Sequence, residues 1–318
     1  MCGIVGYVGN RPAAPIVLGG LRRLAYRGYD SAGLAVLGTQ GLALRRSVGR
    51  LEKLIQVLSE NPAPGCTGIG HTRWATHGGV TEANAHPHVD CRGRVVVIQN
   101  GIVENYLELK QALAAEGHAF RSQTDTEVIA HLIERYLAGG AALPEAVRCA
   151  LPRLKGANAV VVLAADCPDC IVAARLGNAG GVTIGCGDGE AFVASDLPAI
   201  LEHTQQVSFL EDGEMAVLDR EGVRYCRLDG RAVRKPVETI AWDAEATARG
   251  GHKHYMHKEI HEQPRALAGC FSGRVDLDAA EVRLEGLPLD EVRARRLRRI
   301  HTVACGTAWH AGLLGKFL

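Results

Sequence analysis

The chain begins Met1-Cys2-Gly3-Ile4-Val5-Gly6, so that Cys2 directly follows the initiator methionine. Because cysteine is small, we expect Met1 to be removed, which leaves Cys2 with a free α-amine. An α-amine, with a pKa near ~7.8, is partly neutral at pH 7 and can take the proton of a thiol, whose pKa is near ~8.5. Cys2 would then carry both a nucleophile and its base. Cys2 by itself favours the plainer alternative of an N-terminal strand with an inert cysteine.

Composition sets the class of protein. The 318 residues are 47% hydrophobic, which is ample for one large domain or two ordinary ones. A formal net charge of +1 gives no reason to expect nucleic acid or an anionic membrane as a partner. The sequence has no run of about 18 apolar residues that could span a membrane. It also has no N-terminal basic region with an apolar core, so we expect no signal peptide and a cytoplasmic location.

Cysteine and histidine patterns do not predict a metal site or a cofactor. The ten cysteines are scattered, and the single C-x-x-C, Cys167 to Cys170, lacks the second close pair that zinc sites usually have. We expect it to form a turn with two reduced thiols. His257 and His261 are four residues apart, but Lys258 stands where a zincin has its glutamate.

Apolar periodicity predicts grouped helices and many short strands. Helices are expected over 13–26, 51–58, 106–115, 126–137 and 144–154. Strands are expected over 34–37, 67–74, 94–98, 159–163, 171–174, 182–184, 191–194, 206–209, 214–218 and 223–226. Short strands with tight connections and segregated helices favour an α+β fold with antiparallel sheets over a doubly wound parallel sheet.

The last ninety residues follow a different pattern. Residues 228–290 are more polar, with a possible helix over 256–268 that Pro264 interrupts or ends. A strand over 299–304 and a helix over 308–318 are expected to follow. One strand and one helix cannot bury both faces of a parallel unit, so we expect the chain to stop soon after a second domain begins. The expected organisation is a first domain over 2–227, a linker over 228–290 and the start of another domain over 291–318.

Four further stretches combine residue types that suit chemistry. Each has an ordinary structural interpretation when taken alone, as a turn, a solvated loop, a hairpin or a helix N-cap. Short motifs of this kind are weak indications singly. They are Tyr26-Arg27-Gly28-Tyr29-Asp30-Ser31-Ala32-Gly33, His71-Thr72-Arg73-Trp74-Ala75-Thr76-His77-Gly78, Asn100-Gly101-Ile102-Val103-Glu104-Asn105 and Thr124-Asp125-Thr126-Glu127.

Together with the N-terminal Cys-Gly-Ile-Val-Gly, these stretches resemble the class II glutamine amidotransferases, whose nucleophile is an N-terminal cysteine. Within that class the sequence is most similar to the glutamine–fructose-6-phosphate aminotransferase family, and the resemblance continues through 194–196, 253–264 and 304–307. It implies a four-layer αββα sandwich of two antiparallel sheets. It also implies that 291–318 starts a sugar-phosphate isomerase domain, that no cofactor is needed, and that full-length members are homodimers.

The resemblance assigns the catalytic residues. Cys2 would attack the side-chain amide of glutamine and release ammonia. The Asn100 side chain and the Gly101 N–H would stabilise the oxyanion. Arg27 would lie near the amine of the nucleophile. The ammonia would go to fructose 6-phosphate to make glucosamine 6-phosphate, provided that the isomerase domain is present.

The resemblance also assigns the substrate-binding residues. Arg73 suits the α-carboxylate of glutamine by its forked geometry, and Asp125 suits the α-ammonium group. Trp74, Thr76 and His77 lie in a stretch similar to the loop that closes over glutamine, with Gly78-Gly79 as a possible hinge. Thr307, at the start of the last helix, would contribute to a phosphate site.

Three departures from the family pattern bear on these expectations. Gln99 stands where histidine is common, Gly177–Gly181 replaces a more usual Gly-Ser-Pro-like turn, and Ala308 stands where serine is common. Both Gln and His can hydrogen-bond, so we expect an altered site that still works. The open alternatives are a fragment with glutaminase activity only, another class II amidotransferase, and a silent glutamine-binding module.

Overall fold

The computed structural model describes residues 2–241, 250–276, 279, 281–282 and 290–317. The chain divides into two compact units, residues 1–248 and 249–318, and each is described by itself. None of the helices in the described ranges is both long and apolar enough to cross a membrane.

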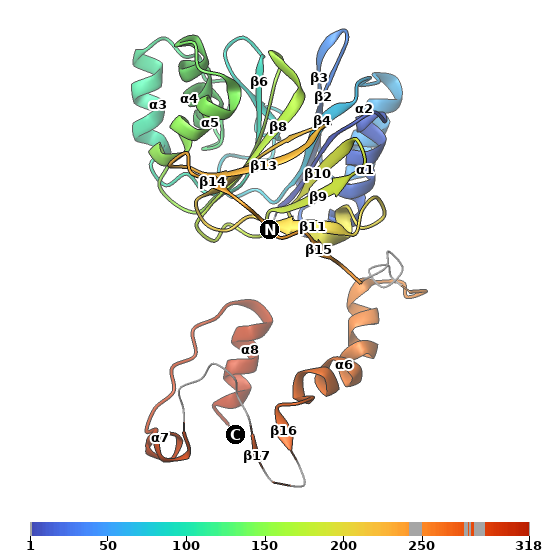
Figure 1. Ribbon diagram of the computed structural model, residues 1–318, viewed down its shortest axis with the longest axis vertical. Coiled ribbons are helices and arrows are strands. Elements are labelled where there is room, and N and C mark those ends of the chain that lie inside the picture. The colour runs from blue at the N-terminus through green and yellow to red at the C-terminus, as the bar shows by residue number, and fades with distance from the viewer. Residues whose placement is uncertain (1, 242–249, 277–278, 280, 283–289, 318) are drawn as a thin grey trace. The chain divides into compact units, whose positions relative to one another are not determined.

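The first unit contains two antiparallel sheets (Figure 1). Within the described residues, the larger sheet has eight strands and the smaller has seven. In spatial order, the larger sheet consists of β15 (Glu238–Thr239), β11 (Gln206–Phe209), β9 (Thr183–Gly187), β10 (Glu190–Ala194), β1 (Gly3–Val8), β4 (Thr67–Arg73), β2 (Ser31–Gly38) and β3 (Gly41–Val48). The smaller consists of β14 (Ala232–Val233), β13 (Gly222–Arg227), β12 (Glu214–Asp219), β8 (Cys167–Leu176), β7 (Asn158–Ala164), β6 (Val95–Gly101) and β5 (His88–Val89).

Helices cover the outer face of each sheet. Figure 1 shows α1 (Ala13–Arg23) and α2 (Leu51–Glu60) on one side of the sheet pair. It shows α3 (Tyr106–Ala115), α4 (Glu127–Ala138) and α5 (Leu143–Ala150) on the other. Short 3-10 helices lie at Ala25–Arg27, Leu151–Arg153 and Leu197–Ala199. The order of layers is therefore helix, sheet, sheet, helix, which confirms the expected α+β sandwich.

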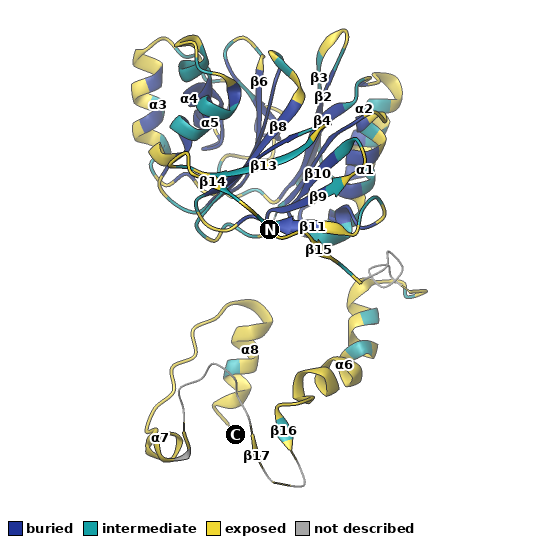
Figure 2. Cartoon of the chain, viewed as in Figure 1, coloured by how far each residue is buried: buried dark blue, intermediate teal, exposed yellow. Residues whose placement is uncertain are grey.

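Three separate apolar clusters hold the four layers together, and Figure 2 shows that the buried residues follow the strands. Consecutive residues of β6 point to different clusters: Val95 and Val97 pack under α3–α5, while Val96 and Ile98 pack between the sheets. Because both faces of each sheet are covered, its central strands are apolar at nearly every position instead of alternating.

The N-terminal strand β1 lies in the middle of the larger sheet. It pairs with β4 on one side and with β10 on the other, and all six of its residues are buried. A side chain at Gly6 would meet Val193 at 2.6 Å, so the Gly-Ile-Val-Gly sequence also serves close packing. Cys2 directly precedes this strand and therefore lies at the end of a central strand of the sheet.

Several element boundaries differ from the sequence expectation. The loop expected up to Gly33 ends earlier, because β2 begins at Ser31, and β3 was not expected at all. β3 lies at the end of the sheet order and carries Arg45 and Arg46, which hides its strand character. The segment from Cys167 to Cys170 forms the start of β8 rather than a turn, and both thiols are free.

The second unit, as far as it is described, contains α6 (Tyr255–Phe271), β16 (Val275–Asp276), β17 (Glu281–Val282), α7 (Glu291–Arg296) and α8 (Gly306–Gly315). Helix α6 continues through Pro264 and is longer than expected. The strand expected over 299–304 does not form, although α8 does. A strand needs hydrogen-bonded neighbours, and β16 and β17 pair only with each other among the described strands.

Candidate active site

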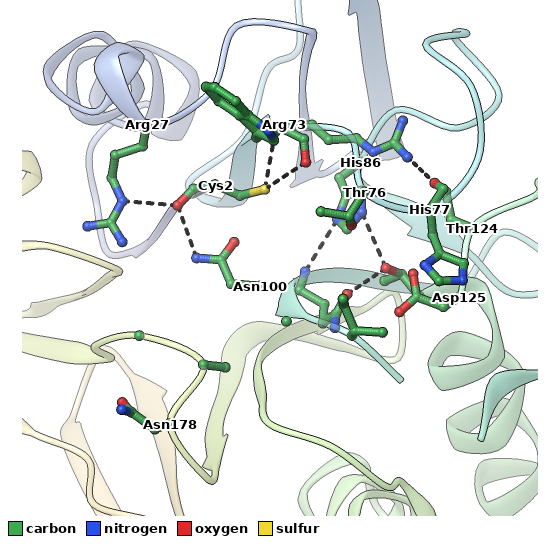
Figure 3. A pocket seen from close by; sticks show the side chains of 17 residues that line it. Cys2, Arg27, Arg73, Thr76, His77, His86, Asn100, Thr124, Asp125 and Asn178 are labelled. Carbon is green, nitrogen blue, oxygen red and sulfur yellow. Dashed lines mark hydrogen bonds between the residues drawn. The ribbon is translucent and has the colours of Figure 1, made fainter. Parts of the chain in front are cut away.

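One cavity, of about 330 Å³, collects residues from both sheets and from the loops beside them. Nine of the ten residues expected to serve the reaction line it: Cys2, Arg27, Arg73, Trp74, Thr76, His77, Asn100, Gly101 and Asp125. The tenth, Thr307, is the second residue of α8 in the other unit. Figure 3 shows Arg27, Cys2 and Asn100 converging from separate segments, with His77 and Asp125 across the cavity from them.

Cys2 lies against the residue that follows β4. Because Gly3 pairs with Thr72 in an antiparallel register, Cys2 falls opposite Arg73 and next to Trp74. The Trp74 N–H donates to Cys2 Sγ at 3.2 Å, and the thiol lies 3.6 Å from the Trp74 carbonyl oxygen. Burial raises the pKa of the Cys2 thiol, while the Trp74 N–H and the guanidinium groups of Arg73 and Arg27 act to lower it. A thiol in this setting needs a base to become a nucleophile at neutral pH.

Two side chains converge on the carbonyl oxygen of Cys2. Asn100 Nδ2 and Arg27 Nε each donate to it at 3.1 Å, as Figure 3 shows. Arg27 is buried, and its Nη1 atom also forms an ion pair with Asp196 at 2.9 Å. Arg27 thus ties the N-terminal residue to the loop after β10, which fixes where the thiol sits.

The orientation of the Asn100 amide is set by His71. His71 Nε2 lies 3.1 Å from both Asn100 Oδ1 and the Gln99 carbonyl oxygen, and both are acceptors. Nε2 must therefore carry the ring proton, which turns Asn100 Oδ1 toward His71 and Nδ2 toward Cys2. Burial lowers the pKa of His71 to about 4, so the ring is neutral at pH 7. His86 stacks on it with ring centroids 4.1 Å apart.

Gly101, the last residue of β6, has a backbone that requires glycine. Its φ is +120°, and a side chain there would approach the Ala157 carbonyl oxygen to 2.1 Å. Any other residue would be strained and would collide with the backbone of the neighbouring chain segment. The peptide N–H at this position therefore has a fixed direction at the rim of the cavity.

Arg73 organises the loop that follows β4. Its guanidinium donates to the carbonyl oxygens of His77, Gly78 at 3.3 Å and Gly79 at 3.2 Å. Gly78 has φ +74°, which permits the tight bend around that guanidinium. At the start of the loop, the Ala75 N–H donates to the Asp30 carboxylate at 2.8 Å. The loop is folded over Arg73 and anchored at its start.

Asp125 is presented by a stretch that α4 holds in place. Its carboxylate accepts from the Val103 N–H at 2.7 Å. Glu127, in the first turn of α4, accepts from the backbone N–H groups of Arg121 and Ser122, each at 2.7 Å. Burial alone would raise the pKa of Glu127. The nearby His131 imidazole and the donors of Ser122 and Arg121 instead lower it to about 2.

Gln99 lines the cavity, and its side chain forms hydrogen bonds with two other polar side chains and none with Cys2. Its side-chain amide donates to Asn158 at 2.6 Å and accepts from Thr126 at 2.6 Å.

The sequence singles out Gln99 and the stretch 177–181, part of which lines the cavity, but it assigns no role to His71 or His86. Nothing in a sequence marks a buried imidazole whose contacts come from a partner strand. The other lining residues without an expected role are Ile102, Thr124, Thr126, Asn178, Ala179 and Gly180.

Comparison with known proteins agrees with this geometry. Residues 59–223 match the profile of the glutamine amidotransferase domain family. The chain is 52% identical over 318 residues to a glutamine–fructose-6-phosphate aminotransferase [isomerizing] of Thermus thermophilus, covering 100% of this chain and 51% of that protein. It is 48% identical to the enzyme of the same name from Symbiobacterium thermophilum, covering 100% and 52% respectively. The chain thus spans about half the length of these curated relatives.

A solved structure shares the fold. The glutamine phosphoribosylpyrophosphate amidotransferase from B. subtilis superposes with a TM-score of 0.64 at 28% identity, covering 73% of this chain and 50% of the other. The profile match covers more than half of the chain, and the cavity combines the residues expected from the motifs. The chain therefore belongs to the glutamine amidotransferase family.

Proposed function

We propose that Cys2, once Met1 has been removed, hydrolyses the side-chain amide of glutamine. The observation that carries the proposal is the meeting of Cys2, Asn100, Gly101, Arg73 and Asp125 in one cavity. These residues come from separate stretches of the chain, and they supply a nucleophile, two oxyanion donors and a pair of opposite charges. A glutamine zwitterion needs that set of groups for hydrolysis.

The reaction would run in two stages. The free α-amine of Cys2 takes the thiol proton, and the thiolate attacks the side-chain carbonyl carbon of glutamine. The resulting oxyanion would receive hydrogen bonds from Asn100 Nδ2 and the Gly101 N–H, each worth roughly 3 to 4 kcal/mol. The ammonium of Cys2 returns its proton to the departing nitrogen, and ammonia leaves a γ-glutamyl thioester. Water then cleaves the thioester to give glutamate and restores the thiol.

Binding of glutamine would use the far side of the cavity. Arg73 offers a forked cation for the α-carboxylate, and Asp125 an anion for the α-ammonium group. Trp74, Thr76 and His77 belong to the loop that Arg73 holds, so closure of this loop and binding of the α-carboxylate would be coupled through one guanidinium.

We further propose that, where the rest of the isomerase domain is present, the ammonia is passed to fructose 6-phosphate to form glucosamine 6-phosphate. The names of the relatives state this substrate for those proteins, and this chain matches about half of their length. Residues 2–227 would form the glutaminase domain, 228–290 the linker and 291–318 the start of a sugar-phosphate isomerase domain. Thr307, near the N-terminus of α8, would face the phosphate. The homodimeric state of full-length members and a cytoplasmic location stay predictions that rest on the resemblance and the sequence.

The direct test is release of ammonia and glutamate from glutamine by purified protein whose N-terminal mass shows that Met1 is absent. We expect turnover by the wild-type protein and none by Cys2→Ala. Cys66→Ala is the matched control, because Cys66 is also a half-buried free thiol but lies outside this cavity. Turnover that persists in Cys2→Ala would refute the assignment.

A binding titration distinguishes the silent-module alternative. If the Met1-trimmed wild-type protein binds glutamine but releases no ammonia, the chain is a binding module under those conditions and not a glutaminase. If it hydrolyses glutamine, the acceptor is tested by adding fructose 6-phosphate and measuring glucosamine 6-phosphate. Ammonia release without amino sugar is the outcome we expect from residues 1–318, and glucosamine 6-phosphate made by them unaided would contradict the proposed need for the rest of the isomerase domain.

A further inference from the structure

Outside the cavity, four side chains of metal-ligating type converge on one point. Cys91 lies in the turn between β5 and β6, and His118 follows α3. His131 and Glu134 lie one turn apart on α4. One ligand atom of each residue lies within 4.8 Å of those of the other three. We propose that Cys91, His118, His131 and Glu134 form a zinc-binding site.

The distances between the ligand atoms fit a tetrahedral centre. Zinc bonds of about 2.3 Å to sulfur and about 2.0 Å to nitrogen and oxygen imply S···N edges of about 3.6 Å and N···O edges of about 3.3 Å. Cys91 Sγ lies 3.7 Å from His118 Nδ1 and 3.6 Å from His131 Nδ1. Glu134 Oε2 lies 3.2 Å from His131 Nδ1 and 2.8 Å from His118 Nδ1. Of these four edges, only the last is shorter than the ion requires, by about 0.5 Å.

The donor set is that of zinc. One thiolate, two imidazoles and one carboxylate form a mixed sulfur, nitrogen and oxygen shell, which borderline ions accept and Mg²⁺ or Ca²⁺ do not. A thiolate and a carboxylate together balance the charge of a divalent ion. The four protein ligands leave no open position for substrate, so the site would be structural rather than catalytic.

The surroundings support ligands of this kind. The Ala119 N–H lies 3.3 Å from Cys91 Sγ, where it would stabilise a thiolate. On the far side of His131, Nε2 lies 3.7 Å from the Glu127 carboxylate. This distance is too long for a hydrogen bond, and Nε2 has no other partner among the residues that the structure describes. A small shift of the ring would therefore bring the carboxylate behind a ligating imidazole, as in many metal sites. The ring of Phe120 packs on His131 with centroids 4.4 Å apart and closes one side.

The site is nearly closed but has an approach for an ion. The His131 side chain is fully buried, while those of His118 and Glu134 are each 13% exposed. A second cavity, of about 510 Å³, is lined by His118 and Glu134 and by both acidic and basic side chains, namely Asp90, Glu116, Asp166, Arg92, Arg94 and Arg135. An ion could reach the ligands through this opening of mixed charge.

A bound ion would cross-link three segments of the chain. The ion would join the β5–β6 turn, the segment after α3 and the middle of α4. The same helix α4 begins directly after Asp125 and Thr126 in the catalytic cavity, so the site would stabilise the helix that carries this wall. We expect its loss to lower stability first and glutamine turnover only secondarily.

A second histidine group provides the control. His252, His257 and His261 also lie close together. The Nδ1 atoms of His252 and His257 are 3.2 Å apart, and the Nε2 atoms of His257 and His261 are 3.3 Å apart. His257 and His261 are exposed, and within the described residues the group includes no cysteine or carboxylate. Weak zinc binding there is separable by mutation, since α6 belongs to the other unit.

The test uses purified full chain, depleted with a chelator and then titrated with zinc. We expect one tightly bound zinc per chain in the wild-type protein, in His257→Ala/His261→Ala and in Cys149→Ser, which removes a free thiol elsewhere. Cys91→Ser should bind at least a hundredfold more weakly. Equal affinity in Cys91→Ser and the wild-type protein, or loss of the zinc in the double histidine variant, would overturn the proposal.

Cobalt substitution of the wild-type protein keeps the proposal testable if Cys91→Ser fails to fold. Tetrahedral Co²⁺ with a thiolate ligand gives an intense visible spectrum and a sulfur-to-metal charge-transfer band in the near ultraviolet. We expect both in the wild-type protein, displaced by one equivalent of zinc. A weak octahedral spectrum without charge transfer would mean that the four residues form a hydrogen-bonded network and not a metal site.

Discussion

At the scale of single residues, the hydrogen bonds around Asn100 indicate how a buried histidine could serve the proposed reaction without touching the substrate. The imidazole of His71 decides which end of the Asn100 amide faces Cys2. An amide turned the other way would present an oxygen to the developing oxyanion and would repel it. His71 is therefore proposed as a positioning residue.

We expect His71→Leu to lower kcat for glutamine hydrolysis by about 10- to 100-fold. Complete removal of one oxyanion donor lowers kcat by roughly 100- to 1,000-fold, and misorientation of Asn100 should cause part of that loss. KM should change little, because His71 does not line the cavity. The rate at which an alkylating agent modifies Cys2 should also stay the same. His203→Leu is the control, since His203 is a largely buried imidazole that stacks on Phe192 elsewhere. Equal losses of kcat in both variants would indicate a general packing defect instead.

For Asp125, a substitution is expected to change KM for glutamine and to leave kcat nearly unchanged. In Asp125→Asn the side-chain oxygen can still accept from Val103, so the loop should keep its shape. The lost charge would remove a charge-assisted hydrogen bond to the α-ammonium group, worth about 1.5 to 3 kcal/mol. We expect KM for glutamine to rise about 10- to 150-fold with little change in kcat, measured by steady-state kinetics. An unchanged KM would place the ammonium group elsewhere, and Asp166→Asn on the surface is the control.

At the scale of elements, helix α1 packs so closely on the larger sheet that two adjacent glycines have opposite requirements. A side chain at Gly20 would meet Val5 at 2.9 Å and the Ala199 carbonyl oxygen at 3.0 Å. A side chain at Gly19 would meet only the end of the flexible Glu202 side chain, at 3.4 Å. Of these two glycines, Gly20 is therefore the one at which helix α1 contacts the sheet.

We expect Gly20→Ala to lower the free energy of unfolding by about 1 to 3 kcal/mol through overpacking. Gly19→Ala should raise it by up to about 1 kcal/mol, because alanine favours the helix over glycine. Urea denaturation of the two variants beside the wild-type protein measures both effects. The same sign of change in the two variants would contradict the packing described for α1.

How far the sequence predicts this structure depends on the range of the interaction. The helices over 51–58 and 106–115 and the apolar strands of both sheets were predicted, because their periodicity is local. The edge strand β3 was missed because half-burial leaves it polar. The contact of His71 with Asn100 follows from strand pairing between distant segments, which no local pattern records. The group around Cys91 was missed for the same reason.

At the scale of the whole molecule, three buried imidazoles make stability depend on pH. Burial lowers the pKa of His71 to about 4 and of His88 to about 3, and lowers the pKa of His86 well below its usual value. The unfolded chain binds a proton at each of them near pH ~6.5. Below that pH the unfolded state holds more protons, so stability is full above ~6.5 and falls as pH drops toward the folded values.

We expect the free energy of unfolding to fall by about 2 kcal/mol per imidazole between pH 7 and pH 5, as measured by urea denaturation. His88→Gln can keep a hydrogen bond to Thr124. Because it removes one of the three imidazoles, the free energy of unfolding of this variant should fall by about 2 kcal/mol less than that of the wild-type protein. Below pH 4.5 the protonation of Glu127, whose pKa is lowered to about 2, should add to it. Equal stability at pH 7 and pH 5 would mean that the three rings are protonated in the folded protein.

The central position of β1 has a consequence for how the protein is made. Val5 pairs with Gly70 on one side and with Ala194 on the other. Strand β1 is thus enclosed on both sides only after some 190 further residues have been synthesised, which takes roughly 10 to 40 s at ordinary elongation rates. During that interval the N-terminus would stay open to an aminopeptidase, so the proposed removal of Met1 would come before the sheet around Cys2 is complete.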